Sequence, residues 1–202
     1  MAAQTARLLA LAFEPEVETA DDAISERVLD AALELAAAAG IRNLTMDDVA
    51  RRATVGRMTV YRRFGSKAAL VDALAVRECR RCLTAISAAL DGEQSADERL
   101  AALFVATLKV IREHPLLARL ARVEPEALVR ELTRDQSAVL RIVTEFLVSL
   151  IELPAAGGPR VQAELCVRLG LSFVLMPDSA IPHDDEQAAY EVARALVAPL
   201  VS

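Results

Sequence analysis

Residues 45–67 read TMDDVARRATVGRMTVYRRFGSK, and this stretch decides the fold. Thr45 is a good helix N-cap, and the two acids in the turn that follows suit the positive end of a helix dipole. Residues 54–56 break that helix, and a second short helix is expected from about Arg57 to Phe64. Two short helices joined by a tight break predict a helix-turn-helix.

The apolar residues of this stretch have the spacing of two packed helices. The small side chain of Ala50 lets the second helix cross close above the first. The expected buried residues around that crossing are Val49, Ala50, Ala53, Val55, Val60 and Phe64. The second helix then presents its remaining side chains and its N-terminal end outwards, an arrangement that fits the major groove of DNA.

The outward-facing residues divide by chemistry into base-reading and phosphate-binding groups. Arg57 can donate two hydrogen bonds to guanine, while Met58 and Thr59 offer apolar contact to the methyl group of thymine. Hydroxyl groups and helix N-termini suit phosphate instead. The complete predicted DNA-binding set is Thr45, Arg57, Met58, Thr59, Tyr61, Arg62 and Lys67.

Basic charge is concentrated in this part of the chain. Residues 42–67 hold seven Arg or Lys and two Asp, a net charge of +5 in a chain whose net charge is -6. A basic island on an acidic body indicates a local site for a polyanion. The alternative is a solvated charged face without a partner.

Composition and spacing predict helices along the remaining chain. Hydrophobic residues make up 54% of the 202 residues, which excludes a disordered chain, and Gly (7) and Pro (8) are too few for a loop-rich sandwich. No alternating strand pattern or internal repeat is present. The expected helices outside the quoted stretch span about 21–39, 66–90, 96–113, 133–152, 160–176 and 184–200, with short pieces from 115 and 125 and capping boxes at 95–98 and 133–136.

The quoted stretch and its surroundings resemble the DNA-binding signature of the tetracycline-repressor (TetR) family over about residues 24–72. The residues that carry the resemblance are Gly40, Thr45, Val49, Ala50, Val55, Thr59, Val60, Tyr61, Phe64, Ser66, Lys67 and Leu70. The sequence departs from the family at the turn, where Gly-Val-Ser is common and this chain has Thr54 and Gly56. The hydroxyl of that serine, and with it one helix-cap bond, is therefore expected to be missing.

The resemblance implies a homodimeric transcriptional regulator, usually a repressor, that binds a palindromic double-stranded DNA operator and leaves it when a small molecule binds. It implies an all-α protein with a three-helix DNA-binding domain at 21–65. Residues 1–20 have weak periodicity and end in an acidic patch, so they are expected to form a flexible arm. Residues 66–202 would form a helical ligand-binding and dimerisation domain. The last two helices would form the dimer interface, and the helix at 66–90 would transmit the effect of the ligand.

The penultimate helix supports dimerisation independently, because it is apolar nearly all round and must be covered on several sides. Its main apolar face comprises Val161, Leu165, Leu169, Phe173 and Met176, and Gly170 and Ser172 would let a partner helix approach. The effector is expected to be hydrophobic or amphipathic. Candidate ligand-binding residues are Phe104, Leu108, His114, Leu117, Phe146 and Phe173. As alternatives, the apolar residues belong to the hydrophobic core without contacting a ligand, and His114 caps a helix or packs at the helix junction.

No nucleophile and base, phosphate loop or metal-ligand set is apparent, so we expect neither an enzyme nor a cofactor or metal. Cys79 and Cys82 are expected to be free thiols, with a redox-sensing pair as the alternative, and the cysteine usage indicates a reducing cytoplasm. No apolar stretch is long enough for a membrane span. The alternative function is a dimeric helical sensor or scaffold that no longer binds DNA, which the unusual turn would favour.

Overall fold

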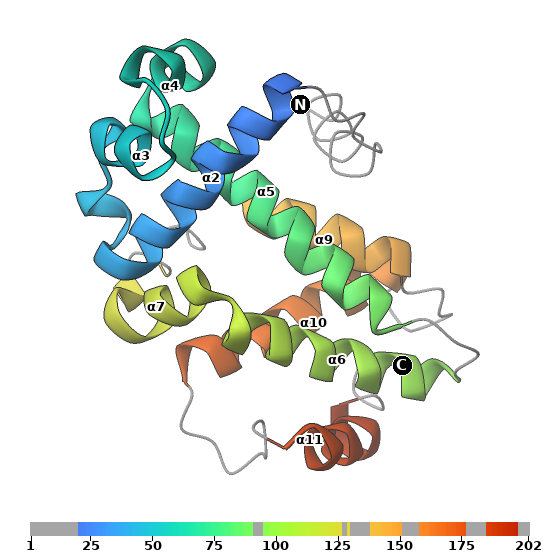
Figure 1. Ribbon diagram of the computed structural model, residues 1–202. Helices are drawn as coiled ribbons and strands as arrows, with labels where there is room; N and C mark the ends of the chain where they lie inside the picture. The colour runs from blue at the N-terminus through green and yellow to red at the C-terminus, as the bar shows by residue number, and fades with distance from the viewer. Residues whose placement is uncertain are drawn as a thin grey trace. The chain divides into compact units, whose positions relative to one another are not determined.

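The computed structural model describes residues 20–90, 95–126, 129, 138–150, 158–176 and 185–197. These residues form helices and connecting turns without a strand (Figure 1), which confirms the all-α fold. The predicted arm lies outside the described residues, apart from Ala20 at the start of the first helix. No helix in the described part of the chain has the length and apolar character needed to cross a membrane.

The described chain divides into two compact units, one ending at Arg80 and the other beginning at Arg81. The division falls inside a long helix, later than the boundary expected at residues 65 and 66. The elements of the first unit are α2 (Ala20–Ala39), the 3-10 turn η1 (Ile41–Asn43), α3 (Met46–Arg52), α4 (Arg57–Phe64) and the first part of α5 (Lys67–Ala88). Their largest fully buried apolar side chains are Val28, Val49, Val60, Leu70 and Leu74, so every one of the four helices contributes to this core.

Helix α2 ends where the sequence predicts, at Gly40. The amide of Gly40 donates to the carbonyl of Ala36 (2.9 Å), and its φ of 89° is one that residues with a Cβ rarely adopt. The turn η1 follows directly and leads the chain into α3.

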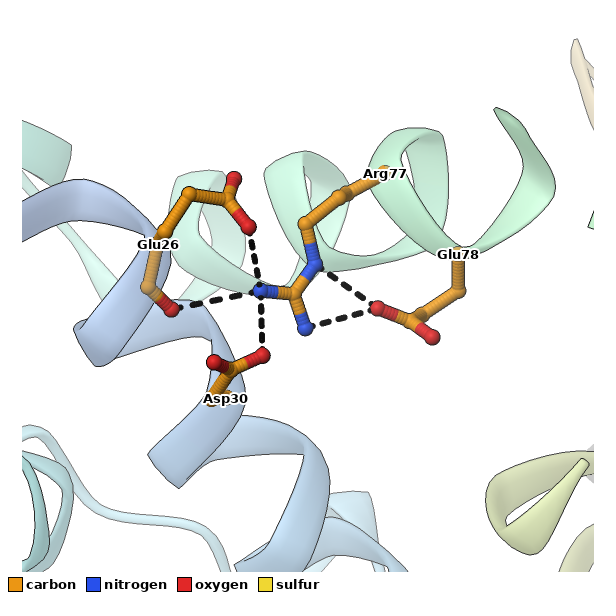
Figure 2. Close-up of polar contacts among 4 residues, drawn as sticks. All are labelled: Glu26, Asp30, Arg77 and Glu78. Carbon is orange, nitrogen blue, oxygen red and sulfur yellow. Dashed lines mark hydrogen bonds and ion pairs between the residues drawn. The ribbon is translucent and has the colours of Figure 1, made fainter. Parts of the chain in front are cut away.

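A buried arginine joins α5 to α2 in the first unit (Figure 2). The Nη1 group of Arg77 donates to the carboxylates of Asp30 (2.8 Å) and Glu26 (3.1 Å) on α2, and to the backbone carbonyl of Glu26 (3.2 Å). Its Nε donates to the carboxylate of Glu78 (2.7 Å), and its Nη2 lies 2.7 Å from the same oxygen. Arg77 and Glu78 are both buried, so this network fixes α5 against α2 from within the unit.

The elements of the second unit are the remainder of α5, α6 (Ala96–Glu113), α7 (Pro115–Val123), α9 (Ala138–Leu150), α10 (Gly158–Leu175), α11 (Glu186–Val192) and the π-helical turn η2 (Ala193–Val197). Helix α6 begins with the predicted capping box, because Ser95 accepts from the amide of Glu98 while its own amide donates to the Glu98 carboxylate. The bonds that the Ser95 amide (2.9 Å) and hydroxyl (2.8 Å) donate to this carboxylate lower the pKa of Glu98. The second predicted capping box, at 133–136, lies outside the described residues.

The last predicted helix, 184–200, is not one regular α-helix. Asp185 caps its start by accepting from the amides of Gln187 (3.0 Å) and Ala188 (3.1 Å), but the chain changes to π-helical turns at Ala193. The change coincides with tertiary packing, since Ala193 is fully buried in a cluster with Phe104 and Leu108 of α6. Residues 198–202 lie outside the described part of the chain.

Candidate nucleic-acid interface

Helix α3 is capped at the residue that the sequence predicts. The hydroxyl of Thr45 accepts from the amide of Asp48 (3.1 Å) and donates to its carboxylate (2.6 Å). A phosphate bound by this hydroxyl would therefore have to replace Asp48 as its acceptor. Thr45 is exposed, as DNA contact requires.

The turn between α3 and α4 contains a strained residue. Thr54 has a φ of 56°, a conformation that disfavours β-branched side chains. Two sets of hydrogen bonds hold it: the amide of Val55 donates to the carbonyl of Ala50 (3.0 Å), and Arg27 of α2 donates to the carbonyls of Ala53 (2.7 Å) and Thr54 (3.3 Å). No pattern in the sequence indicates this role for Arg27, because its partners are backbone atoms that only the folded turn brings together.

Gly56 is the N-cap of helix α4 and, having no side chain, forms no side-chain cap bond, as expected. Val60 is fully buried, but Val55 and Phe64 are only half-buried, so the prediction that all three are buried is wrong for two of them. Val55 lies in the turn before α4, and Phe64 is the last residue of α4.

The outer face of α4 carries the side chains proposed to read bases. Met58 is 76% exposed, Arg57 and Arg62 are exposed, and Thr59 and Tyr61 are half-buried. Arg57 is held from two sides: its Nε lies 2.9 Å from the Asp47 carboxylate, and its guanidinium carbon lies 5.3 Å from the centre of the Tyr61 ring. Arg57 and Tyr61 are therefore accessible to a ligand outside the unit.

Ion pairs within the first unit engage part of the basic island. Arg51 pairs with Asp48 (2.7 Å), Arg52 pairs with Glu34 of α2, and Arg57 pairs with Asp47. Within the described part of the chain Arg62 makes no ion pair. The charge that the island can offer to phosphate is therefore smaller than the sequence count indicates, and among the described residues Arg42 and Arg62 are its exposed arginines without an ion pair.

Lys67 lies at the start of α5, where Ser66 accepts from the amide of Ala69 (3.2 Å) and confirms the predicted cap. The ammonium group of Lys67 donates to the backbone carbonyl of Arg42 (2.8 Å). This contact leaves two of its three N–H donors for another acceptor.

The candidate ligand-binding residues do not all come together. Phe104 and Leu108 of α6 share a cluster with Phe173 of α10, in which the two phenyl rings meet edge to face at 5.2 Å. Phe146 is buried and Leu117 half-buried, without being members of that cluster. His114 caps α7, because its Nδ1 accepts from the amide of Leu117 (3.3 Å). That bond matches the capping alternative for His114.

The three cysteines form no disulfide and are half-buried. Burial raises the pKa of the Cys79 thiol although Arg80 acts in the opposite direction, and burial raises the pKa of Cys166 to about 11. A thiol with a raised pKa is protonated at neutral pH and reacts slowly, which argues against Cys79 as the reactive member of a redox pair. The described residues contain no group of three or more side chains arranged to hold a metal ion.

The same part of the chain matches a known family. Residues 28–74 fit the family model of bacterial regulatory proteins, tetR family. This match spans most of α2, α3, α4 and the first part of α5. Residues 28–74, with the helix-turn-helix described above, therefore form a DNA-binding domain of the tetR family.

Relatives of known name extend the similarity beyond that region. The transcriptional regulator AlkX of Mycobacterium tuberculosis is 27% identical over 203 residues, covering 92% of this chain and 88% of AlkX. An uncharacterised regulator of Xanthobacter autotrophicus is 41% identical over 75 residues, 37% of each chain. Both relatives are named as HTH-type transcriptional regulators, and neither is named as an enzyme.

Solved structures show the same fold. The TetR-family repressor AlkX of a Dietzia strain, 23% identical, superposes with a TM-score of 0.62 over 88% of this chain and 94% of its own. GusR of Salmonella enterica, 20% identical, superposes with a TM-score of 0.67 over 92% of this chain and 99% of its own. The fold is therefore that of the tetR family along most of the chain.

The departure from the common tetR-family turn leads to a first prediction. Thr54→Gly is expected to raise the free energy of unfolding by about 0.5–1 kcal/mol, because glycine removes the strain at φ 56° and only part of that gain is lost to the greater freedom of the unfolded chain. Urea denaturation followed by circular dichroism measures the change.

Gly65→Ala is the matched control for this prediction. Gly65 also has a positive φ (72°), and an added Cβ there meets no atom within 4 Å, so only backbone strain is introduced. The stability should fall by about 1 kcal/mol. A Thr54→Gly variant no more stable than the unaltered chain contradicts the assignment of strain to Thr54.

Lys67 gives a second prediction, on the salt dependence of DNA binding. Lys67→Ala is expected to weaken binding to every DNA sequence by the same factor and to reduce the slope of log K against log salt by about one unit, since one phosphate contact is lost. Lys109→Ala, which removes a lysine of α6 paired with Glu186 (2.7 Å), should leave the slope unchanged. Sequence-dependent losses with Lys67→Ala would identify it as a base-reading residue instead.

Proposed function

We propose that the chain is a homodimeric, ligand-responsive repressor that binds a palindromic operator through α4 of each subunit. The observation that carries this proposal is the outer face of α4, where Arg57, Met58 and Arg62 are exposed on a helix fixed by the buried Val60. An exposed, donor-bearing helix of this kind suits the major groove, and two copies related by symmetry suit a palindrome.

Exposed apolar side chains support a dimer interface on the last helices. On α10, Val161 (48% exposed) and Leu165 (40%) face solvent, and Met176 (64%) follows the helix end. Leu196 of η2 is 63% exposed. Several large apolar residues left uncovered on these two elements are expected to be buried by a second copy. Gly170 does not contribute, because it faces Thr107 of its own chain.

The apolar interior of the second unit supports a hydrophobic or amphipathic effector. Phe104, Leu108 and Phe173 provide aromatic and aliphatic surface where α6 and α10 meet. The structure of the Dietzia AlkX repressor is described as implicated in biodegradation of n-alkanes, so alkanes and their oxidised derivatives are the first compounds to test. Bound effector would favour a state in which the two copies of α4 are wrongly spaced for adjacent major grooves.

The test begins with selection of genomic fragments bound by the purified protein. Operator affinity is then measured with and without each candidate effector. We expect one effector class to lower the affinity at least tenfold, as a coupling of about 1–3 kcal/mol requires. An effector that binds the protein without changing operator affinity contradicts the proposed regulation.

A salt titration separates this function from a sensor or scaffold that has lost DNA binding. Groove binding predicts that log K falls steeply and linearly as log salt rises. Absence of any DNA binding at low salt would favour the scaffold, in which the strained turn at Thr54 no longer serves recognition.

A further inference from the structure

The ion pair between Asp47 and Arg57 links the first turn of α3 to the first residue of α4. The Asp47 carboxylate lies 2.9 Å from the Nε of Arg57, and both side chains are at least half exposed. An ion pair this exposed contributes little to stability. Its main consequence is to restrict the position of a long side chain that points away from the domain.

Arginine can donate two parallel hydrogen bonds from either of two edges, one formed by Nε and an Nη and the other by the two Nη groups. Asp47 occupies Nε, so the edge containing Nε is already used. The Tyr61 ring covers one face of the same guanidinium at 5.3 Å. Two neighbours thus restrict Arg57, and the edge formed by its two Nη groups is the one left for a pair of acceptors.

We propose that Asp47 is a positioning residue for base recognition: by accepting from Nε of Arg57, it presents the two Nη groups to N7 and O6 of a guanine. This inference rests on the proposed function. It adds a specificity-determining residue that does not itself touch DNA. Asp48 cannot take this role, because its carboxylate already accepts from Thr45 and Arg51.

The negative charge of Asp47 has a second effect that a purely structural residue would not have. A carboxylate beside the recognition helix repels the phosphate backbone of any DNA sequence. Asp47 should therefore lower the affinity for unrelated DNA and improve discrimination at one guanine. Both effects raise the ratio of operator affinity to the affinity for unrelated DNA, which is the specificity.

Two substitutions separate the acceptor of Asp47 from its charge. Asp47→Ala removes both, whereas Asp47→Asn removes the charge and keeps an oxygen that can accept from Nε. We expect both variants to bind unrelated DNA about threefold more tightly at 0.1 M salt. Asp47→Ala should lose about three- to tenfold in discrimination at the guanine that Arg57 reads, since Arg57 must then be ordered on binding. Asp47→Asn should keep discrimination within about twofold of the unaltered protein.

The measurement uses the full chain, the operator obtained by fragment selection, and operators with each base pair substituted in turn. Arg57→Ala identifies the base pair that Arg57 reads. In the Arg57→Ala background, Asp47→Ala should not change discrimination at that base pair. Glu34→Ala is the matched control for Asp47→Ala, because it makes the same change in net charge and breaks the exposed pair with Arg52 instead.

The proposal is overturned if Asp47→Ala leaves discrimination at the guanine unchanged, or if Asp47→Asn loses as much discrimination as Asp47→Ala. It is also overturned if Asp47→Ala lowers discrimination further in the Arg57→Ala background. Failure of the proposed function gives a different result. In that case the unaltered protein shows no preference for any sequence, and both proposals are rejected together. A protein that reads the operator through Arg57 without needing Asp47 rejects only the positioning role.

Discussion

Replacing Arg77 with alanine is expected to lower the free energy of unfolding by about 3–5 kcal/mol, because it removes one partner of a buried ion pair. Glu78 is the other partner, and its side chain is only 9% exposed and cannot recover water when Arg77 is lost. Glu26 and Asp30, the other partners of Arg77, are 38% and 54% exposed and remain hydrated. Urea denaturation followed by circular dichroism measures the loss.

Two further variants test this explanation. Arg168→Ala removes an arginine of α10 that pairs with Glu164 at 2.6 Å but is 72% exposed, and it should cost less than about 1 kcal/mol. Arg77→Met combined with Glu78→Leu removes the buried charges together and should destabilise less than Arg77→Ala alone. Equal losses for Arg77→Ala and Arg168→Ala would show that burial of the network is unimportant.

The beginnings of helices were the most predictable part of the fold. The capping box of Ser95 and Glu98 and the cap formed by Thr45 use side chains and amides within three residues of one another, so their signals are local in the sequence. The change to π-helical turns at Ala193 could not be predicted in this way. It is associated with packing against Phe104, which lies far away in the sequence.

The site was predictable in its residue types but not in its connections. The order of polar and apolar residues in α4 indicated that Arg57 and Met58 face outwards and Val60 inwards, and the structure agrees. The contacts of Arg57 with Asp47 and of Arg27 with the turn carbonyls cross a turn whose shape depends on the positive φ of Thr54. A sequence with threonine at that position gives no signal for such a backbone.

Arg57→Ala is expected to lower operator affinity by about 1–3 kcal/mol, which corresponds to about 5- to 150-fold, and to relax discrimination at one base pair. The reason is the loss of a bidentate donor from the exposed start of α4. Arg62 lies on the same helix, but it is five residues further along and therefore more than one turn away. Binding to the operator and to each single-base variant, measured at one salt concentration, gives both quantities.

Arg52→Ala provides the control for that measurement. Arg52 belongs to the same basic island and is 58% exposed, but it lies at the end of α3 and pairs with Glu34 of α2. Its removal makes the same change in net charge as Arg57→Ala, so a loss of general electrostatic attraction should be similar in the two variants. Only Arg57→Ala should change the ranking of operators that differ at one base pair. If both variants weaken all operators by the same factor, Arg57 contributes charge alone, and base recognition must lie elsewhere on α4.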